Sequence, residues 1–236
     1  MLNKDRKHLC IIPAKGSSQR LPGKNKAMFN EKPLVVWAIE TCLAANIFDL
    51  IYVSSDDDEI LALAQAYPVK VVKRPENLSK DPAGVKDVCH YVIHGLEKQL
   101  LSFDAFSVVI PTSPLRTVEH LRGAWRLFCS DMIECVMSVT PLGHSPQRAL
   151  AINSSGAVYP YFGMESMKMA QELEQLYMHD GTVLIADVEA FLKKNNFYNL
   201  SIIPYVIAAD ESVDVDTPLD LKWAEFLHQS SKVSMK

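Results

Sequence analysis

Short apolar runs alternate with amphipathic segments along most of the 236-residue chain. The runs are nearly continuous and rich in β-branched residues, which is typical of strands buried on both faces of a sheet. The segments between them have the apolar spacing of helices that cover such a sheet. The pattern predicts an α/β fold with a doubly wound, mostly parallel sheet. The predicted strands are 9–12, 50–54, 69–72, 105–110, 134–140, 182–186 and 202–206, and the predicted helices are 33–45, 57–66, 85–101, 118–129 and 217–228.

The regular alternation stops between residues 141 and 180. An Asn-Ser-Ser-Gly sequence at 153–156 separates two short apolar runs and predicts a hairpin. A methionine-rich stretch follows at 164–169, and such a surface indicates a lid or a subunit contact. The alternative is an excursion that packs on the same core. We expect a single domain over 1–236, with 141–180 as an inserted subregion.

The composition restricts the class of protein further. A net charge of -4 provides no general attraction to nucleic acid or to a membrane surface. The five cysteines have neither a CxxC motif nor a Cys/His metal spacing, so we expect reduced, buried thiols and a cytoplasmic protein. The polar N-terminus is unlike a signal peptide, and no apolar run approaches the roughly 20 residues of a membrane helix.

The loop at residues 13–27 follows the first predicted strand and is rich in Gly, Ser, Lys and Arg. Backbone N–H groups and positive charge at the end of a strand are suited to a phosphate chain. The spacing is neither that of a Walker A loop nor that of a dinucleotide fingerprint, and the alternative is a solvated basic loop. We favour a triphosphate-binding loop. The residues expected to bind the nucleotide there are Lys15, Gly16, Ser17, Ser18, Arg20 and Lys24.

Two carboxylates stand two residues apart near the C-terminus, at Asp214 and Asp216. In an extended chain their side chains point to the same side, because side chains alternate with a period of two. Such a pair is a hard oxygen site suited to Mg²⁺ that bridges substrate phosphates. The alternative is that Asp216 or Thr217 caps the last helix, with Pro218 in its first turn. The two interpretations are compatible.

The Pro-Thr-Ser-Pro-Leu-Arg sequence at 111–116 ends another predicted strand. Its two prolines make the turn rigid, and it brings Thr112, Ser113 and Arg116 to the sheet edge where ligands bind. The sequence has no Gly-x-Ser-x-Gly elbow and no HExxH motif. We therefore expect the hydroxyls to be ligands and the chemistry to be direct displacement at phosphorus, with positioning and charge neutralisation supplied by the protein.

Two further polar features follow predicted strands. Arg74 is placed for contact with a phosphate or a nucleobase, and the alternative is a surface arginine. The acidic cluster at 54–59 is better explained by the start of a helix than by contact with a substrate, because acids near a helix N-terminus are favoured by the dipole.

In their order along nearly the whole chain, these motifs resemble those of the CMP-sialic acid synthetase family, the acylneuraminate or nonulosonic acid cytidylyltransferases. Residues 20–24 are also similar to the KDO cytidylyltransferases, although the other motifs favour the sialic type. The similar segments are 13–18 (Pro-Ala-Arg-x-x-Ser in the family), Lys24-Asn25 (Lys-Asn), 53–56 (Val-Ser-Thr-Asp), Arg74-Pro75 (Arg-Pro), 111–116 (Pro-Thr-Ser-Pro-Leu-Arg) and 214–217 (Asp-x-Asp-Thr).

The resemblance implies a Rossmann-like domain, a homodimer formed through the irregular insertion, and a role in cell-surface polysaccharide biosynthesis. It implies that the anomeric hydroxyl of an acidic sugar attacks the α-phosphate of CTP and that pyrophosphate leaves. Asp214 and Asp216 would hold Mg²⁺. The residues that would cradle the nucleotide are Lys15, Ser18, Lys24 and Asn25, and the catalytic group would be Lys15, Lys24, Asp214 and Asp216.

Three departures from the family pattern shape the expected substrate. Lys15 replaces an arginine and loses its planar fork. Ile110 replaces a glutamine, and 177–181 replaces an arginine-rich approach to an Asn-Gly pair. Because the last two belong to the sugar side, they point to a nonulosonic acid other than N-acetylneuraminate, with His179 and Lys168 as candidate contacts.

Two other functions stay open on the sequence. One is a nucleotidylyltransferase that acts on a sugar phosphate, and the other is a non-catalytic regulator that binds a nucleotide or sugar on the same fold. Asp214 and Asp216 favour an enzyme, because binding alone does not require a metal at the α-phosphate.

Overall fold

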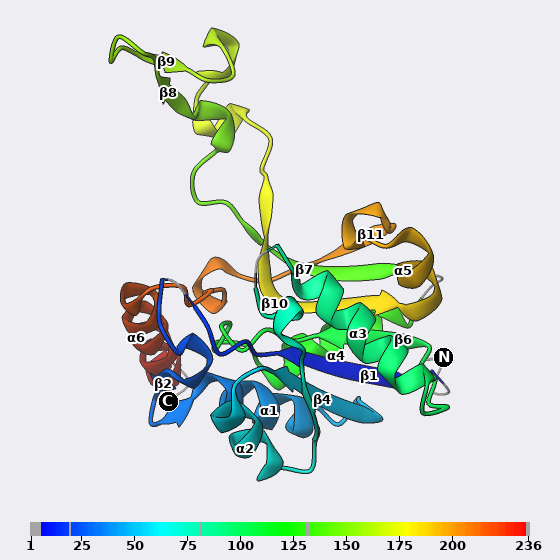
Figure 1. Cartoon of the computed structure of the whole chain (residues 1–236). Helices are drawn as coiled ribbons and strands as arrows, with labels where there is room; N and C mark the ends of the chain where they lie inside the picture. Colours follow the sequence, from blue (N-terminus) through cyan, green and yellow to red (C-terminus); the bar gives the residue numbers. More distant parts are fainter. Residues whose placement is uncertain (1–5, 19, 81, 131–132, 235–236) are drawn as a thin grey trace.

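The computed structural model of the chain describes residues 6–18, 20–80, 82–130 and 133–234 (Figure 1). Its centre is a seven-stranded sheet with the order β11-β7-β10-β6-β1-β4-β5. All pairs are parallel except those of β10, which runs antiparallel to β6 and β7. The predicted mostly parallel, doubly wound sheet is confirmed. The strands are β1 (His8–Pro13), β4 (Leu50–Ser55), β5 (Lys70–Lys73), β6 (Ala105–Val108), β7 (Cys135–Pro141), β10 (Tyr177–Asp187) and β11 (Ile202–Val206).

Helices cover both faces of the sheet, because residues along each strand alternate between the faces. In β1, Cys10 and Ile12 pack in a cluster with α1, α2 and α4. Leu9 and Ile11 pack on the opposite face with α3 and α5. The helices are α1 (Leu34–Ala45), α2 (Asp58–Gln65), α3 (Val85–Glu97), α4 (Val118–Phe128), α5 (Val188–Lys194) and α6 (Pro218–Ser234).

The structure adds one helix that was not predicted and moves several boundaries; α6, for example, ends at Ser234 rather than at residue 228. The short α5 was not predicted; Asp187 at the end of β10 caps it by accepting from the Ala190 N–H. Helix α3 ends at Glu97 rather than at residue 101, and Leu100 has a left-handed φ of 61° that a helix does not allow. Strand β10 begins at Tyr177 rather than at residue 182. The other short elements are β2 (Met28–Phe29), β3 (Lys32–Pro33), β8 (Leu150–Ile152), β9 (Val158–Pro160), and the 3-10 turns Lys24–Lys26, Glu76–Leu78, Pro146–Arg148, Met164–Ser166, Ala170–Glu172, Phe197–Asn199 and Ala209–Glu211.

A third apolar cluster joins the last helix to the beginning of the chain. Val213 and Val215 are buried with Phe29 of β2 and Leu34 of α1. The residues between and after these valines are more exposed, so the segment before α6 alternates between core and solvent. This packing brings the acidic motif near the C-terminus to the loop that follows β1.

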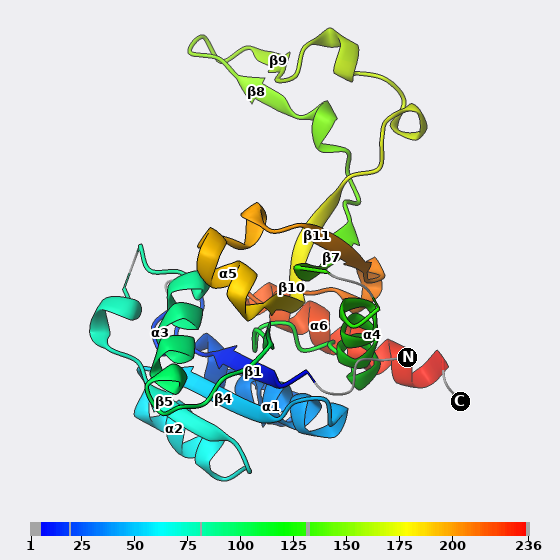
Figure 2. The ribbon, with the colours of Figure 1, turned by 90° about the vertical axis from the view of Figure 1, so that its right-hand side faces the viewer.

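The segment between β7 and β10 projects away from the sheet domain, and both views show this (Figures 1 and 2). The predicted hairpin is confirmed, since β8 and β9 pair antiparallel at its far end. Large apolar side chains of this arm are exposed; they include Ile152, Tyr161, Phe162 and Met164. Within the described ranges, no helix combines the length and apolarity that crossing a bilayer requires.

Candidate active site

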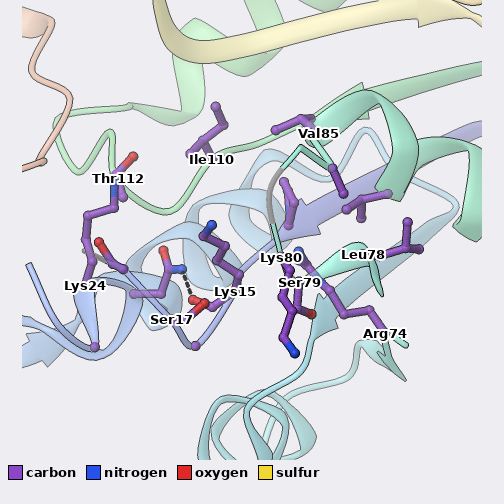
Figure 3. A pocket seen from close by; sticks show the side chains of 18 of the residues that line it. Lys15, Ser17, Lys24, Arg74, Leu78, Ser79, Lys80, Val85, Ile110 and Thr112 are labelled. Carbon is purple, nitrogen blue, oxygen red and sulfur yellow. Dashed lines mark hydrogen bonds between the residues drawn. The ribbon is translucent and has the colours of Figure 1, made fainter. Parts of the chain in front are cut away.

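A cavity of about 810 Å³ lies beyond the carboxyl ends of the central strands. The chain passes from β1 to β4 on one side and later returns to place β6 on the other side of β1, and ligands of doubly wound sheets bind at such a reversal. The cavity is lined by the loop after β1, the segment after β5, the start of α3, the residues after β6, and Asp216. Figure 3 shows Lys15, Ser17 and Lys24 on one side of it, and Arg74, Ser79 and Lys80 on the other.

The loop after β1 is held in shape by two polar contacts. The Asn25 side-chain amide donates to the Lys15 carbonyl at 2.8 Å, and the Gly16 N–H donates to the Asp56 carboxylate at 3.0 Å. A Cβ atom at Gly16 would lie 2.6 Å from the Cβ atom of Asp57, so this close approach requires glycine. The structure brings the seven predicted loop residues to the cavity wall, namely Lys15, Gly16, Ser17, Ser18, Arg20, Lys24 and Asn25.

The two predicted carboxylates lie beside this loop and the residues after β6. Asp216 lines the cavity and forms ion pairs with Lys24 at 2.8 Å and Arg20 at 2.7 Å. Asp214 accepts a 2.5 Å hydrogen bond from the Thr112 hydroxyl, and the Val215 N–H donates to the Thr112 carbonyl at 2.8 Å. In the part of the chain that is described, no cluster of three His, Cys, Asp or Glu residues suitable for a metal occurs. The predicted Mg²⁺ ligands are Asp214 and Asp216, and of these Asp216 is the one that lines the cavity.

The capping alternative for this motif also holds. The Asp220 carboxylate accepts from the N–H and hydroxyl of Thr217, and the Asp220 N–H donates back to that hydroxyl at 3.3 Å. This reciprocal pair begins α6 at Pro218, so neither Asp214 nor Asp216 is used as its cap.

The opposite wall contains buried polar atoms whose hydrogen-bonding capacity is unused. Arg74 donates to the Ser54 carbonyl at 2.6 Å, whereas its Nε is buried and has no hydrogen-bond partner among the described residues. The same holds for the hydroxyl of Ser79 on this wall and, in the loop after β1, for the amide oxygen of Asn25. Burial lowers the pKa of Arg74. An unsatisfied buried polar group costs about 1–3 kcal/mol, so this arrangement is suited to a polar ligand that supplies the partners.

Three residues predicted to contact the nucleotide or its metal, Ser113, Arg116 and Asp214, are not among the residues that line the cavity. Ser113 is buried, and its hydroxyl donates to the Asp180 carbonyl at 3.4 Å. Arg116 is also buried and donates to backbone carbonyls, so the expectation that it faces a ligand is wrong. The turn directs its side chain under the loop and toward β10, an orientation that depends on distant residues. Lys168 is an exposed residue of the arm.

The acidic cluster after β4 has the helix-start role that the sequence favoured. Asp57 caps α2 by accepting from the N–H groups of Glu59 at 2.9 Å and Ile60 at 3.3 Å. It also pairs with Lys26 at 2.8 Å, which ties the basic loop to the helix.

A smaller pocket of about 250 Å³ adjoins the cavity, with Val85 and Ile110 lining both. It is predominantly apolar and also includes Phe197, Tyr198 and His179. The buried Nε2 of His179 has no hydrogen-bond partner in the described ranges. Burial lowers the pKa of His179, and the charges of Asp180 and Asp214 oppose that shift.

Sequence reasoning missed several lining residues. Ser79 and Lys80 are in an irregular segment after Arg74-Pro75, and Phe197 and Tyr198 follow the unpredicted α5. No spacing rule connects these positions to the phosphate loop, because folding alone brings them together. Their positions in the chain were the one available signal. Ser79 and Lys80 follow β5, whose end lies at the ligand-binding edge, and Phe197 and Tyr198 follow β10 and the short α5.

Comparison with known proteins agrees with this geometry. Residues 9–141 match the cytidylyltransferase family, the class of enzyme that the sheet and the cationic cavity indicate. The pseudaminic acid cytidylyltransferase of Campylobacter jejuni is 31% identical over 224 residues, which cover 94% of this chain and 97% of that protein. The CMP-N,N'-diacetyllegionaminic acid synthase of Legionella pneumophila is 31% identical over 221 residues, which cover 92% and 93%. This chain belongs to the nonulosonic acid cytidylyltransferase family and is a nucleotidyltransferase.

Two more distant likenesses complete the comparison. The N-acylneuraminate cytidylyltransferase of Escherichia coli is 27% identical over 224 residues, which cover 94% of this chain but 52% of that protein. The solved structure of a CMP:2-keto-3-deoxy-manno-octonic acid synthetase complexed with CTP has a TM-score of 0.70 at 16% identity, and the match covers 95% of this chain and 99% of that one. At this identity the likeness establishes the fold alone.

Proposed function

We propose that this protein transfers CMP from CTP to the anomeric hydroxyl of a nonulosonic acid and releases pyrophosphate. The main support is the cavity at the sheet reversal, which combines a cationic loop, an acidic residue and unsatisfied polar atoms on the opposite wall. Its volume of about 810 Å³ is sufficient for a nucleoside triphosphate with part of a second substrate. The hydroxyl oxygen attacks the α-phosphorus while the bond to pyrophosphate breaks.

In this reaction the protein positions the substrates and neutralises charge. Lys15, Lys24 and Arg20 line the cavity as cations for the triphosphate. Arg74, on the opposite wall, would use its Nε–H on an acceptor of the nucleotide. Lys24 and Arg20 pair with Asp216. With Mg²⁺ held by Asp216, the two cations would be released to the charge that develops on the departing pyrophosphate.

Mg²⁺ fits the donor set at this site. Asp214 and Asp216 provide hard oxygen donors, and Mg²⁺ commonly uses one or two carboxylates together with substrate phosphates. When bound there, Mg²⁺ would neutralise charge on the phosphates and polarise the α-phosphate. The Thr112 hydroxyl would orient the Asp214 carboxylate, since the two are in hydrogen-bond contact.

We propose that the sugar is a pseudaminic- or legionaminic-type acid and that it occupies the smaller pocket. The names of the two relatives that are 31% identical support this choice, as do the apolar walls formed by Ile110, Phe197 and Tyr198. These walls are suited to methyl and acyl groups rather than to hydroxyls. Because burial keeps His179 neutral near pH 7, its Nε2 would contact a polar atom of the sugar without adding charge.

The arm supports a proposal about assembly. Its exposed Tyr161, Phe162 and Met164 form an apolar surface that a second copy of the chain would cover, giving a homodimer. We further propose that the protein works in the cytoplasm, since its largely buried thiols are suited to a reducing compartment.

The deciding measurement is pyrophosphate release from CTP and Mg²⁺ with a panel of sugars. The panel contains pseudaminic, legionaminic, N-acetylneuraminic and KDO acids together with hexose phosphates, and UTP and ATP serve as nucleotide controls. We expect release with CTP and one di-acylamido nonulosonic acid, and loss of release with EDTA. Release with a hexose phosphate alone would instead establish a sugar-phosphate nucleotidylyltransferase. Binding of CTP without turnover on any sugar would favour a regulator.

A further inference from the structure

Two buried charged side chains lie beside the site without lining it. Arg116 is 6% exposed and Asp180 is 5% exposed, and the lining residues of both cavities exclude them. Burying a charge is costly unless the group is paired and hydrogen-bonded. Their position therefore calls for an explanation other than direct contact with a ligand.

Arg116 joins two different walls of the site. Its Nε donates to the Thr182 carbonyl at 2.5 Å, and one terminal nitrogen donates to the Ile110 carbonyl at 2.5 Å and to the Gly181 carbonyl at 3.4 Å. Ile110 lines both the cavity and the smaller pocket, and Gly181 lines the pocket. The rigid fork of one guanidinium thus connects the turn after β6 to strand β10.

Asp180 organises the irregularity in β10 that forms the second of these walls. The register between β10 and β7 shifts between His179 and Leu184. Within this bulge the Asp180 carboxylate accepts from the Ser138 hydroxyl at 2.5 Å, the Thr182 N–H at 3.1 Å and the Thr182 hydroxyl at 2.6 Å. The backbone therefore folds around the carboxylate, and His179, the preceding residue, reaches the pocket.

The charges of the two residues are complementary. Burial lowers the pKa of Arg116, and the negative charge of Asp180 is one of the influences that oppose this shift. The turn that contains Arg116 also contains Thr112, whose hydroxyl and carbonyl bind the segment of Asp214 and Val215. Hydrogen bonds at both ends of the turn 110–116 thus link the bulge in β10, through the chain of the turn, to the acidic motif.

We propose that Arg116 and Asp180 are positioning residues that hold the sugar-side wall of the site in register with the nucleotide side. The inference rests on the proposed function, in which the pocket beside His179 receives the sugar. Because neither residue reaches the cavity, their loss should displace the sugar wall while the cationic loop after β1 keeps its own contacts. The effect should therefore fall on the KM of the sugar and, through the turn that holds Thr112 against Asp214, on kcat. The KM of CTP should change little, because the loop after β1 keeps its contacts.

The test compares Arg116→Lys and Asp180→Asn with a matched control, Ser107→Ala. Ser107 is buried in β6 and contacts His8, so the control removes a buried polar contact of the same sheet away from the site. We expect both variants to raise the KM of the sugar by about tenfold or more and to lower kcat, with the KM of CTP within about twofold of wild type. The control should leave both KM values unchanged. A fall in active protein with both KM values unchanged, or an equal rise in both, would overturn the proposal.

A second readout is independent of turnover. Amide hydrogen exchange should accelerate over residues 179–184 in both variants and stay at the wild-type rate in β1, because the bulge loses contacts that the central strand does not share. Wild-type exchange over 179–184 in both variants would refute the positioning role whatever the enzyme acts on. If the wild-type protein turns over no sugar, the proposed function is contradicted. Hydrogen exchange over residues 179–184 would still decide whether Arg116 and Asp180 hold that segment in place.

Discussion

His8 provides the most quantitative prediction. It is fully buried at the start of β1, with its ring stacked on Trp125 at 3.8 Å between centroids. Its Nδ1 lies 3.1 Å from the Ile47 carbonyl, which only accepts, so Nδ1 carries the proton and donates. Its Nε2 then accepts from the Ser107 hydroxyl at 2.8 Å. The neutral ring is satisfied in this position. Burial lowers the pKa of His8 from 6.5 to about 3.

Acid should therefore destabilise the fold through this residue. The unfolded chain takes up the proton near pH 6.5, whereas the folded chain resists it down to about pH 3. Between these values the unfolded state binds more protons, so the free energy of unfolding falls as the pH falls. Each unit of pKa difference corresponds to about 1.4 kcal/mol, and the loss between pH 7 and pH 5 amounts to about 2 kcal/mol.

Urea unfolding of the wild type and of His8→Gln at both pH values measures this term. Glutamine can donate and accept but does not titrate, and carboxylates that are sensitive to acid are common to both proteins and cancel in the comparison. We expect the wild type to lose about 2 kcal/mol more than the variant between pH 7 and pH 5. Equal losses in the two proteins would refute the interpretation of His8 as a buried neutral group.

Three other predictions concern the site and the arm. Asp214→Ala and Asp216→Ala should each lower kcat by about a hundredfold or more without unfolding the protein, as judged by circular dichroism, and near-normal rates in both would remove their metal role. Arg74→Lys keeps the charge but loses the unpartnered Nε–H, so the KM for CTP should rise about tenfold, and an unchanged KM would count against a nucleotide contact. Tyr161→Ser combined with Phe162→Ser should yield a monomer by light scattering, whereas a wild-type monomer would exclude the homodimer.

The secondary structure was largely predictable because its evidence is local. The continuous apolar run of β1 follows from burial on both faces of one strand, and the helical spacing in α3 and α4 likewise reflects neighbours within one element. The predicted elements were wrong where the apolar pattern is short or where an element is defined by its pairing with a distant strand. The seven-residue α5 is too short for a clear period, and the first residues of β10 are separated from the rest of the strand by a bulge, so they are defined only by their pairing with β7.

The site was predictable in its parts rather than in its contacts. The loop after β1 and the acidic motif both had recognisable chemistry, and the doubly wound pattern predicts that loops after parallel strands meet at one edge. The 2.8 Å ion pair between Lys24 and Asp216, however, joins residues 192 positions apart. Its existence depends on how Val213 and Val215 pack in the third apolar cluster.

The sequence by itself determined the α/β class, the order of the elements and the chemical types available at the edge of the sheet, because these depend on the spacing of neighbouring residues. The tertiary structure alone decided what each polar group contacts. Arg116 is a residue type that commonly binds phosphate, yet it donates to the carbonyls of Ile110 and Thr182. Arg74, in contrast, keeps an Nε–H without a partner among the described residues, in the wall of the cavity. Both are arginines after strands. Both are buried, so their hydrogen bonds separate their roles. The bonds from Arg116 to β10 form only when distant segments pack together.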